Sequence, residues 1–180
     1  MRLHESGASS RTYAIMSVVA CLLQVGLAPQ ISLFGGTFNF MVVLALTLAL
    51  TREVHASVIC GFLCGLFFDL TSAVPVGLMA LVLTIGSFAV STMARGMAPG
   101  ITVEGVRLAI VSMVVVNIVY AVSLYVLGVQ SDLMWTLGHG LSGAVLDSVA
   151  CLPFIAAGGG SAPSRGFAVR AGGSRLKGLK

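Results

Sequence analysis

The sequence predicts an all-α integral membrane protein with six transmembrane helices and both termini in the cytoplasm. Its composition, its six apolar segments and the one-sided placement of its cations support this prediction. Of the 180 residues, 57% are hydrophobic and only 9% are charged, whereas a soluble domain carries about 25% charged residues. The mean hydropathy is +1.04. We therefore expect a single helical domain inside a membrane.

The transmembrane domain is expected over residues 13–157, between a polar N-terminal segment at 1–12 and a flexible basic tail at 158–180. The tail has too few apolar residues to fold by itself. The fifth apolar segment has the length of about 20 residues that a helix needs to cross a bilayer. The second spans only about 20 Å as a helix. We therefore expect flanking residues to extend this helix, or the helix to lie where the bilayer is thin. The six segments are residues 13–28, 38–50, 56–73, 76–93, 108–127 and 133–157.

The first apolar segment has some features of a signal peptide, because Gly26, Leu27 and Ala28 form a small-residue pattern like a cleavage site. Pro29 directly after this pattern argues against cleavage, and so do the five apolar segments that follow. We interpret the first segment as a retained helix.

The cations give the orientation. All ten Lys and Arg residues lie before the first segment, in the connections that follow the second and fourth segments, or in the tail. The connections after the first, third and fifth segments contain neither residue. Because cytoplasmic loops carry the excess of Lys and Arg, this distribution predicts six spans with both ends inside.

The third and fourth segments form the most informative stretch. Gly61, Gly65 and Asp69 are spaced by four residues and therefore share one face of a helix. Pro75 ends this helix and Gly77 opens the next apolar run. This pattern predicts two spanning helices joined by a tight turn, with small residues on the face where they pack. A carboxylate inside a membrane helix costs about 2.5–3.5 kcal/mol on insertion scales, so we expect Asp69 to face protein.

Asp69 and Asp147 are the only acids well inside apolar segments, and each has two interpretations. They act as ion or proton sites, or they accept hydrogen bonds where helices meet. For Asp69, the free amides at the start of the following helix are the expected donors. Gln24 and Asn117, near the middle of their segments, are expected to form hydrogen bonds between helices.

His139, Gly143 and Asp147 form one stripe along the sixth segment, but one His with one Asp is too small a set for a metal.

A short pattern also recurs within the chain. Either it marks an inverted repeat of three helices plus three, or it is a coincidence in a glycine-rich chain. The pattern Gly65-x3-Asp69-x5-Pro75 recurs as Gly143-x3-Asp147-x5-Pro153.

No motif for catalysis is found. The sequence has no phosphate-binding glycine loop, no HExxH, no GxSxG and no basic patch interleaved with aromatic residues. Its four cysteines all lie in apolar segments without a CxxC pair, which is typical of packing residues. We therefore expect no enzymatic activity, no cofactor, no metal and no nucleic acid partner.

The third and fourth segments resemble the signature of the rod shape-determining protein MreD family, a G-F-x-x-G-L-x-x-D run followed by a turn and a G-x-x-A-L helix start. Further resemblance comes from Asn39 at the head of a short second helix, from the loop at residues 52–55, and from Pro153. One departure is Phe38, where the family often has a proline; the long basic tail is another. The matching residues are Gly61, Phe62, Gly65, Leu66, Asp69, Leu70, Pro75, Gly77, Ala80 and Leu81.

The resemblance implies a non-enzymatic scaffold subunit of the bacterial cell-elongation complex, which controls rod shape and lateral peptidoglycan synthesis at the plasma membrane. It implies association with an MreC-like bitopic protein. Through that protein it implies indirect contact with MreB filaments, a RodA-type glycosyltransferase and a penicillin-binding transpeptidase. We expect the face of Gly61 and Gly65 to receive a partner helix, and the basic inner surface to contact anionic lipid.

A second interpretation comes from the similarity of this family's fold to the substrate-binding membrane subunits of energy-coupling-factor vitamin transporters. Such a subunit needs polar and aromatic residues on its outer loops to hold a ligand. The outer connections supply few of these: Gln30, Ser32, Thr37, Ser72, Gln130, Ser131 and Asp132, with Trp135 just beyond.

Overall fold

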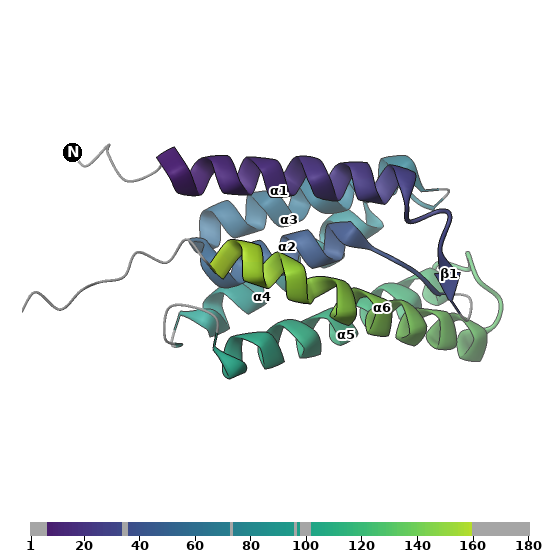
Figure 1. Cartoon of the computed structure of the whole chain (residues 1–180). Coiled ribbons are helices and arrows are strands. Elements are labelled where there is room, and N and C mark those ends of the chain that lie inside the picture. The colour runs from purple at the N-terminus through teal and green to yellow at the C-terminus, as the bar shows by residue number, and fades with distance from the viewer. Residues whose placement is uncertain (1–6, 34–35, 73, 96, 98–101, 160–180) are drawn as a thin grey trace, which may run out of the picture.

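The computed structural model describes residues 7–33, 36–72, 74–95, 97 and 102–159, and in this part of the chain six helices pack side by side along one long axis (Figure 1). The helical fold class is confirmed. A two-stranded antiparallel hairpin, which the sequence did not predict, follows the first helix. The elements are α1 (Gly7–Gly26), β1 (Ser32–Leu33), β2 (Gly36–Thr37), α2 (Phe40–Thr51), α3 (Val54–Thr71), α4 (Leu78–Ala94), α5 (Val103–Val126) and α6 (Leu133–Gly159).

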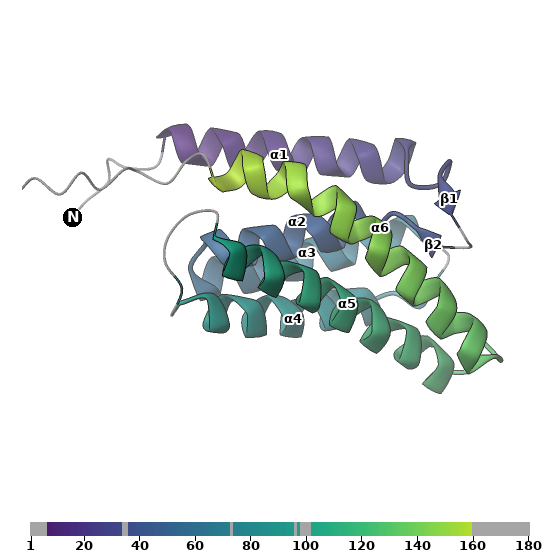
Figure 2. The ribbon, with the colours of Figure 1, turned by 60° about the horizontal axis from the view of Figure 1, so that its bottom comes forward.

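The short helix α2 lies at the centre of the molecule. It contacts all five other helices, and Figure 2 shows it between α1 and α6 on one side and the remaining helices on the other. Every residue from Phe40 to Ala49 is buried. A helix that is apolar all round is stable only when other elements enclose it. Its 12 residues are therefore surrounded by protein over most of their length.

Three helices are long and apolar enough to cross a membrane: Val54–Thr71, Val103–Val126 and Leu133–Ala156. The apolar parts of α1, α2 and α4 are shorter. Helix α4 begins at Leu78 instead of the predicted residue 76, because Gly77 adopts a left-handed conformation with φ of 101°. This conformation cannot be part of an α-helix.

The outer surface of the long helices is apolar. Ile59 and Leu63 on α3 and Val111 and Val115 on α5 are each more than half exposed. Large exposed apolar surfaces are rare on soluble monomers and mark contact with a membrane or a partner. The outward-facing side of these helices therefore fits a hydrocarbon environment.

Consecutive helices run in opposite directions, so the chain alternates between two ends of the molecule (Figure 1). The start of α1, the connection α2–α3, the end of α4, the start of α5 and the end of α6 lie at one end, which we call the cationic end. Of the cations in the described residues, Arg11, Arg52, Arg95 and Arg107 belong to this end. The β-hairpin and the connections α3–α4 and α5–α6 lie at the opposite end. The predictions for residues 1–6 and for the tail from 160 onward fall outside the described residues.

Candidate functional site

Asp69 is buried where α3 meets the start of α4, with only 1% of its surface exposed. Its Oδ2 accepts hydrogen bonds from the backbone amides of Gly77 at 2.9 Å and Ala80 at 3.1 Å, and its Oδ1 accepts one from Met79 at 3.2 Å. The first amides of a helix have no partner within the helix. Asp69 therefore caps α4 from a neighbouring helix, with the donors that the sequence indicated.

The turn between the two helices brings these amides to Asp69. The carbonyl of Pro75 accepts a hydrogen bond from the amide of Leu78 at 3.5 Å. Gly77 has φ of 101°, a region in which residues with a side chain are strained. The predicted motif residues Pro75 and Gly77 thus shape the start of α4.

Gly61 and Gly65 let α3 and α4 come into backbone contact. A Cβ atom on Gly65 would lie 2.6 Å from the amide nitrogen of Ala80 and 2.6 Å from the carbonyl oxygen of Met79. A Cβ on Gly61 would lie 2.8 Å from the carbonyl oxygen of Leu83. This is the packing of consecutive helices that the sequence predicts. The expectation that a partner helix binds the same face is wrong, because α4 of the same chain occupies it.

Asp147 is completely buried on α6, with 0% of its surface exposed. Its Oδ1 accepts a hydrogen bond from the backbone amide of Asn39 at 2.7 Å, and its Oδ2 accepts one from the Asn117 side chain at 3.0 Å. Asn117 lies on α5, and its Nδ2 also donates to the carbonyl of Met113 at 3.0 Å. One carboxylate thus links α6 to α5 and to the start of α2.

Two further amides at the start of α2 also donate to side chains. Asn39 is the N-cap residue, and its Oδ1 accepts a hydrogen bond from Val42 at 3.3 Å. The Oε1 of Gln24 on α1 accepts one from Phe40 at 2.9 Å. These bonds are needed because Phe40 and Asn39 are buried, and an unpaired buried donor costs about 1–3 kcal/mol. We call Gln24, Asn39, Asn117 and Asp147 the α2 polar cluster.

The β-hairpin completes this arrangement by bringing the chain close to α6. A Cβ on Gly36 would lie 2.5 Å from the amide nitrogen of Gly143. Gly143 itself lies beside Thr37, because a Cβ there would be 3.5 Å from the Thr37 carbonyl oxygen. Gly36 therefore allows the backbone of the hairpin to come close to α6.

The two halves of the recurring pattern have similar local geometry but different topology. In each, an aspartate accepts a hydrogen bond from a backbone amide at the start of another helix, and a glycine lies four residues earlier. Asp69 caps the next helix along the chain, whereas Asp147 caps a helix far earlier in the sequence. An inverted repeat would require equivalent partners, so this difference favours the coincidence.

The remaining predicted residues are spread over the surface. Phe62 on α3 and Leu81 on α4 project outward, with 48% and 58% of their surfaces exposed. Pro153 is exposed within α6. His139 does not join Asp147, since its Nδ1 bonds the Trp135 carbonyl at 2.8 Å and its ring stacks on Trp135 with centroids 3.6 Å apart.

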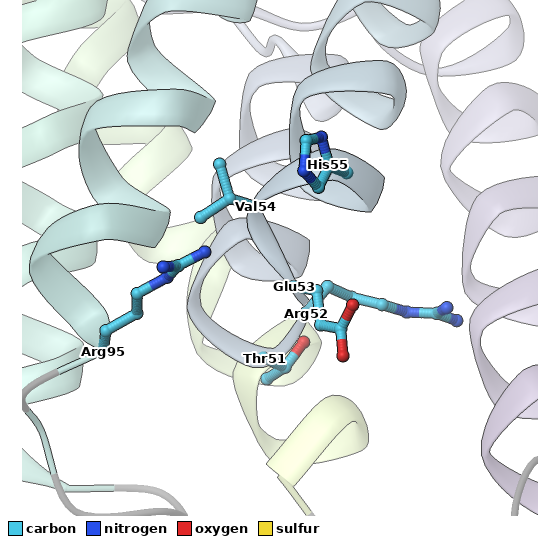
Figure 3. Close-up of a pocket in the computed structure, with 6 residues that line it drawn as sticks. All are labelled: Thr51, Arg52, Glu53, Val54, His55 and Arg95. Carbon is cyan, nitrogen blue, oxygen red and sulfur yellow. The ribbon is translucent and has the colours of Figure 1, made fainter. Parts of the chain in front are cut away.

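A shallow open cavity of about 450 Å³ lies at the cationic end, between the α2–α3 connection and Arg95, the residue that follows α4 (Figure 3). The sequence shows the charges of this loop but does not indicate a cavity. Within residues that the structure describes, no group of three or more His, Cys, Asp or Glu side chains is placed to hold a metal. The lining residues are Thr51, Arg52, Glu53, Val54, His55 and Arg95.

Comparisons of the chain with known protein families, with curated proteins and with solved structures find no match. A functional assignment therefore depends on the residues, on their geometry and on the resemblance described above. Most of the predicted site residues lie at two junctions: Gly61, Gly65, Asp69, Pro75, Gly77 and Ala80 where α3 meets α4, and Asn39 and Asp147 where α6 meets the start of α2.

Proposed function

We propose that this chain is a non-enzymatic scaffold subunit of the bacterial cell-elongation complex. The observation that carries this proposal is that both carboxylates within apolar helices accept hydrogen bonds from helix starts or from an amide side chain. Such groups hold helices together. A carrier of ions or protons needs a group that is free to exchange its ligand, and these two are engaged in the fold.

The same arrangement supports the MreD-like assignment of the motif. Gly65, Asp69, Gly77 and Ala80 act together in one α3–α4 junction, which accounts for their spacing along the sequence. The family-like signature is thus the set of residues that builds a rigid helical pair. A rigid surface of fixed shape is what a scaffold subunit offers to its partners.

In this proposal the protein is a multi-pass protein of the bacterial plasma membrane, with six spanning segments and both termini in the cytoplasm. The gathering of described arginines at one end supports this orientation under the positive-inside rule. Enclosure of α2 by the other helices supports six segments, because a short helix surrounded by protein does not need to match the bilayer thickness.

The exposed members of the motif are the proposed contacts for an MreC-like bitopic partner. Phe62 and Leu81 do not contribute to either capping arrangement and point away from the protein. Aromatic and large apolar side chains are common anchors at interfaces. This assignment replaces the glycine face, which α4 fills.

The experiment uses a rod-shaped bacterium depleted of its own MreD-family protein, in which this chain is expressed. The wild-type chain is expected to restore rod shape and to co-purify with the MreC-like protein. The pair Phe62→Ala and Leu81→Ala is expected to reduce this recovery. The matched control is Leu63→Ala with Ile85→Ala, because these residues are comparably exposed on the same helices, at 56% and 62%, but lie outside the motif.

Two outcomes would contradict the proposal. Round cells after expression of a stable, membrane-inserted wild-type chain would remove the elongation role. Co-purification with a pair of ATPases, without the MreC-like protein, would favour the transporter interpretation.

A further inference from the structure

The cavity at the cationic end has an unusual balance of charge for a membrane protein surface. Two guanidinium groups and one imidazole line it, against the single carboxylate of Glu53. Among the residues that the structure describes, these groups form no ion pair with each other or with another side chain. Within the described part of the chain, the cations of this cavity are therefore left without a paired carboxylate.

The two arginines have different surroundings. The guanidinium of Arg52 lies over the Tyr13 ring, with its carbon 4.1 Å from the ring centroid. Figure 3 shows Arg52 extending toward α1, whereas Arg95 extends from the end of α4 toward Val54. A cation–π contact holds Arg52 in place, and Arg95 is left as the cation that faces the start of α3.

The start of α3 adds positive potential to the same place. Glu53 is the N-cap residue, but its side chain makes no capping hydrogen bond, and Figure 3 shows it pointing away from Arg95. The N-terminus of a helix carries a partial positive charge and unpaired amides. Arg95 and the first turn of α3 thus border the cavity from two helices.

The helices that carry the lining residues also have exposed apolar side chains a short distance along the chain. Met93 on α4 is 62% exposed and Ile59 on α3 is 60% exposed, each within about one turn of the polar lining. The acyl chains of a lipid need an apolar protein surface, which these helices offer. A free phosphate ion would make no use of this surface.

We propose that this cavity binds the phosphate of an anionic phospholipid headgroup, with Arg95 as its main cation. The proposal rests on the orientation given under the proposed function, in which the cationic end faces the cytoplasmic leaflet. Basic pockets between membrane helices on that side are suited to lipid headgroups. The lipid would hold the α2–α3 connection and the end of α4 at a constant depth in the interface.

The test is native mass spectrometry of the purified full chain in detergent, titrated with phosphatidylglycerol, phosphatidylcholine or inorganic phosphate. Phosphatidylglycerol is expected to bind more tightly than phosphatidylcholine. Arg95→Gln is expected to weaken phosphatidylglycerol about fivefold, the equivalent of ~1 kcal/mol for one cation at a lipid surface. Glu53→Gln is expected to strengthen it, because the only carboxylate of the cavity is removed.

The matched control is Arg107→Gln, which removes the same charge from the same end but outside the cavity. Equal losses with Arg95→Gln and Arg107→Gln would overturn the proposal, because binding would then follow net charge alone. Equal binding of phosphatidylglycerol and phosphatidylcholine would also overturn it. Binding of inorganic phosphate that depends on Arg95, without binding of phosphatidylglycerol, would also overturn the proposal and assign the cavity to a free anion.

Lipid binding by the purified chain is independent of the cell-shape assay. If the chain restores rod shape but does not bind phosphatidylglycerol selectively, only the proposed lipid site is contradicted. If the chain binds phosphatidylglycerol selectively but does not restore rod shape, only the proposed function is contradicted.

Discussion

Asp69 satisfies three backbone donors with two oxygens, and this limits which side chains can replace it. An asparagine has one acceptor oxygen, and its amide nitrogen would face one or two of the same donors. The change from Asp to Asn is therefore not neutral at this position, even though the shape is kept. A leucine offers no acceptor at all.

We expect Asp69→Asn to lower the free energy of unfolding by about 1–3 kcal/mol and Asp69→Leu to lower it further, because each buried donor left unpaired costs about 1–3 kcal/mol. The measurement is reversible unfolding of the purified chain in mixed micelles. Thr71→Val serves as the control, since the Thr71 hydroxyl is exposed and bonds only carbonyls of its own helix. A stability for Asp69→Leu equal to that of the wild type would contradict the capping role.

Asp147 and Asn117 share one hydrogen bond between two helices, so their substitutions are expected to be coupled. In a double-mutant cycle of Asn117→Ala and Asp147→Ala, we expect a coupling free energy of about 0.5–3 kcal/mol. Ser17→Ala is the control partner, because Ser17 bonds only the carbonyl of Tyr13 in its own helix. Additive effects of Asn117→Ala and Asp147→Ala would show that the bond between them contributes nothing to stability.

At the scale of the helix, the packing of α3 against α4 depends on a missing side chain. Gly65→Ala places a methyl group against backbone atoms of Met79 and Ala80, which cannot rotate out of the way. We expect a loss of about 1–3 kcal/mol in the free energy of unfolding, the usual cost of overpacking. The two helices must separate to accept the new atom.

Gly138→Ala on α6 is the matched control for Gly65→Ala. A Cβ at Gly138 meets nothing within 4 Å. Alanine is favoured over glycine within a helix by about 0.5–1 kcal/mol, so this variant is expected to be neutral or slightly more stable. Thermal unfolding of both variants in the same detergent compares them directly. A Gly65→Ala chain as stable as Gly138→Ala would contradict tight α3–α4 packing.

The sequence predicted the α3–α4 junction well because its parts are close together in the chain. The four-residue spacing of Gly61, Gly65 and Asp69 places them on one face, and the next helix supplies the nearest free amides. The bond between Asp147 and Asn39 joins residues 108 positions apart, and helical periodicity carries no information at that distance. Gln24 and Asn117 were expected to bond between helices, but their partners were not predictable.

The sequence also could not predict that protein surrounds α2, or that a β-hairpin precedes it. The apolar run at 38–50 indicates burial but does not distinguish lipid from protein as the surrounding medium. The structure encloses α2 in protein. Irregular backbone before a short helix is tolerated inside a membrane protein only where other protein groups satisfy it, and Asp147 and Gln24 do so here.

At the scale of the whole molecule, the alternation of helices places Arg52 and Arg95 at one end and Ser131 at the other. We expect the cationic end to face the cytoplasm, because translocating arginines across the membrane is disfavoured. The measurement is labelling by a membrane-impermeant maleimide in a chain whose four native cysteines are replaced. The reporters are Arg52→Cys, Arg95→Cys, Ser131→Cys and Ser174→Cys in the tail.

In intact cells only Ser131→Cys is expected to react, and the other three should react after the membrane is permeabilised. Labelling of the tail reporter from outside, with Arg52→Cys protected, would require an odd number of spans between residue 52 and the tail. This result would contradict the six-span proposal. Labelling of Arg52→Cys and Arg95→Cys from outside, with Ser131→Cys protected, would invert the molecule. The cavity beside Arg95 would then face the outer leaflet, so this measurement also tests the setting on which the proposed lipid site depends.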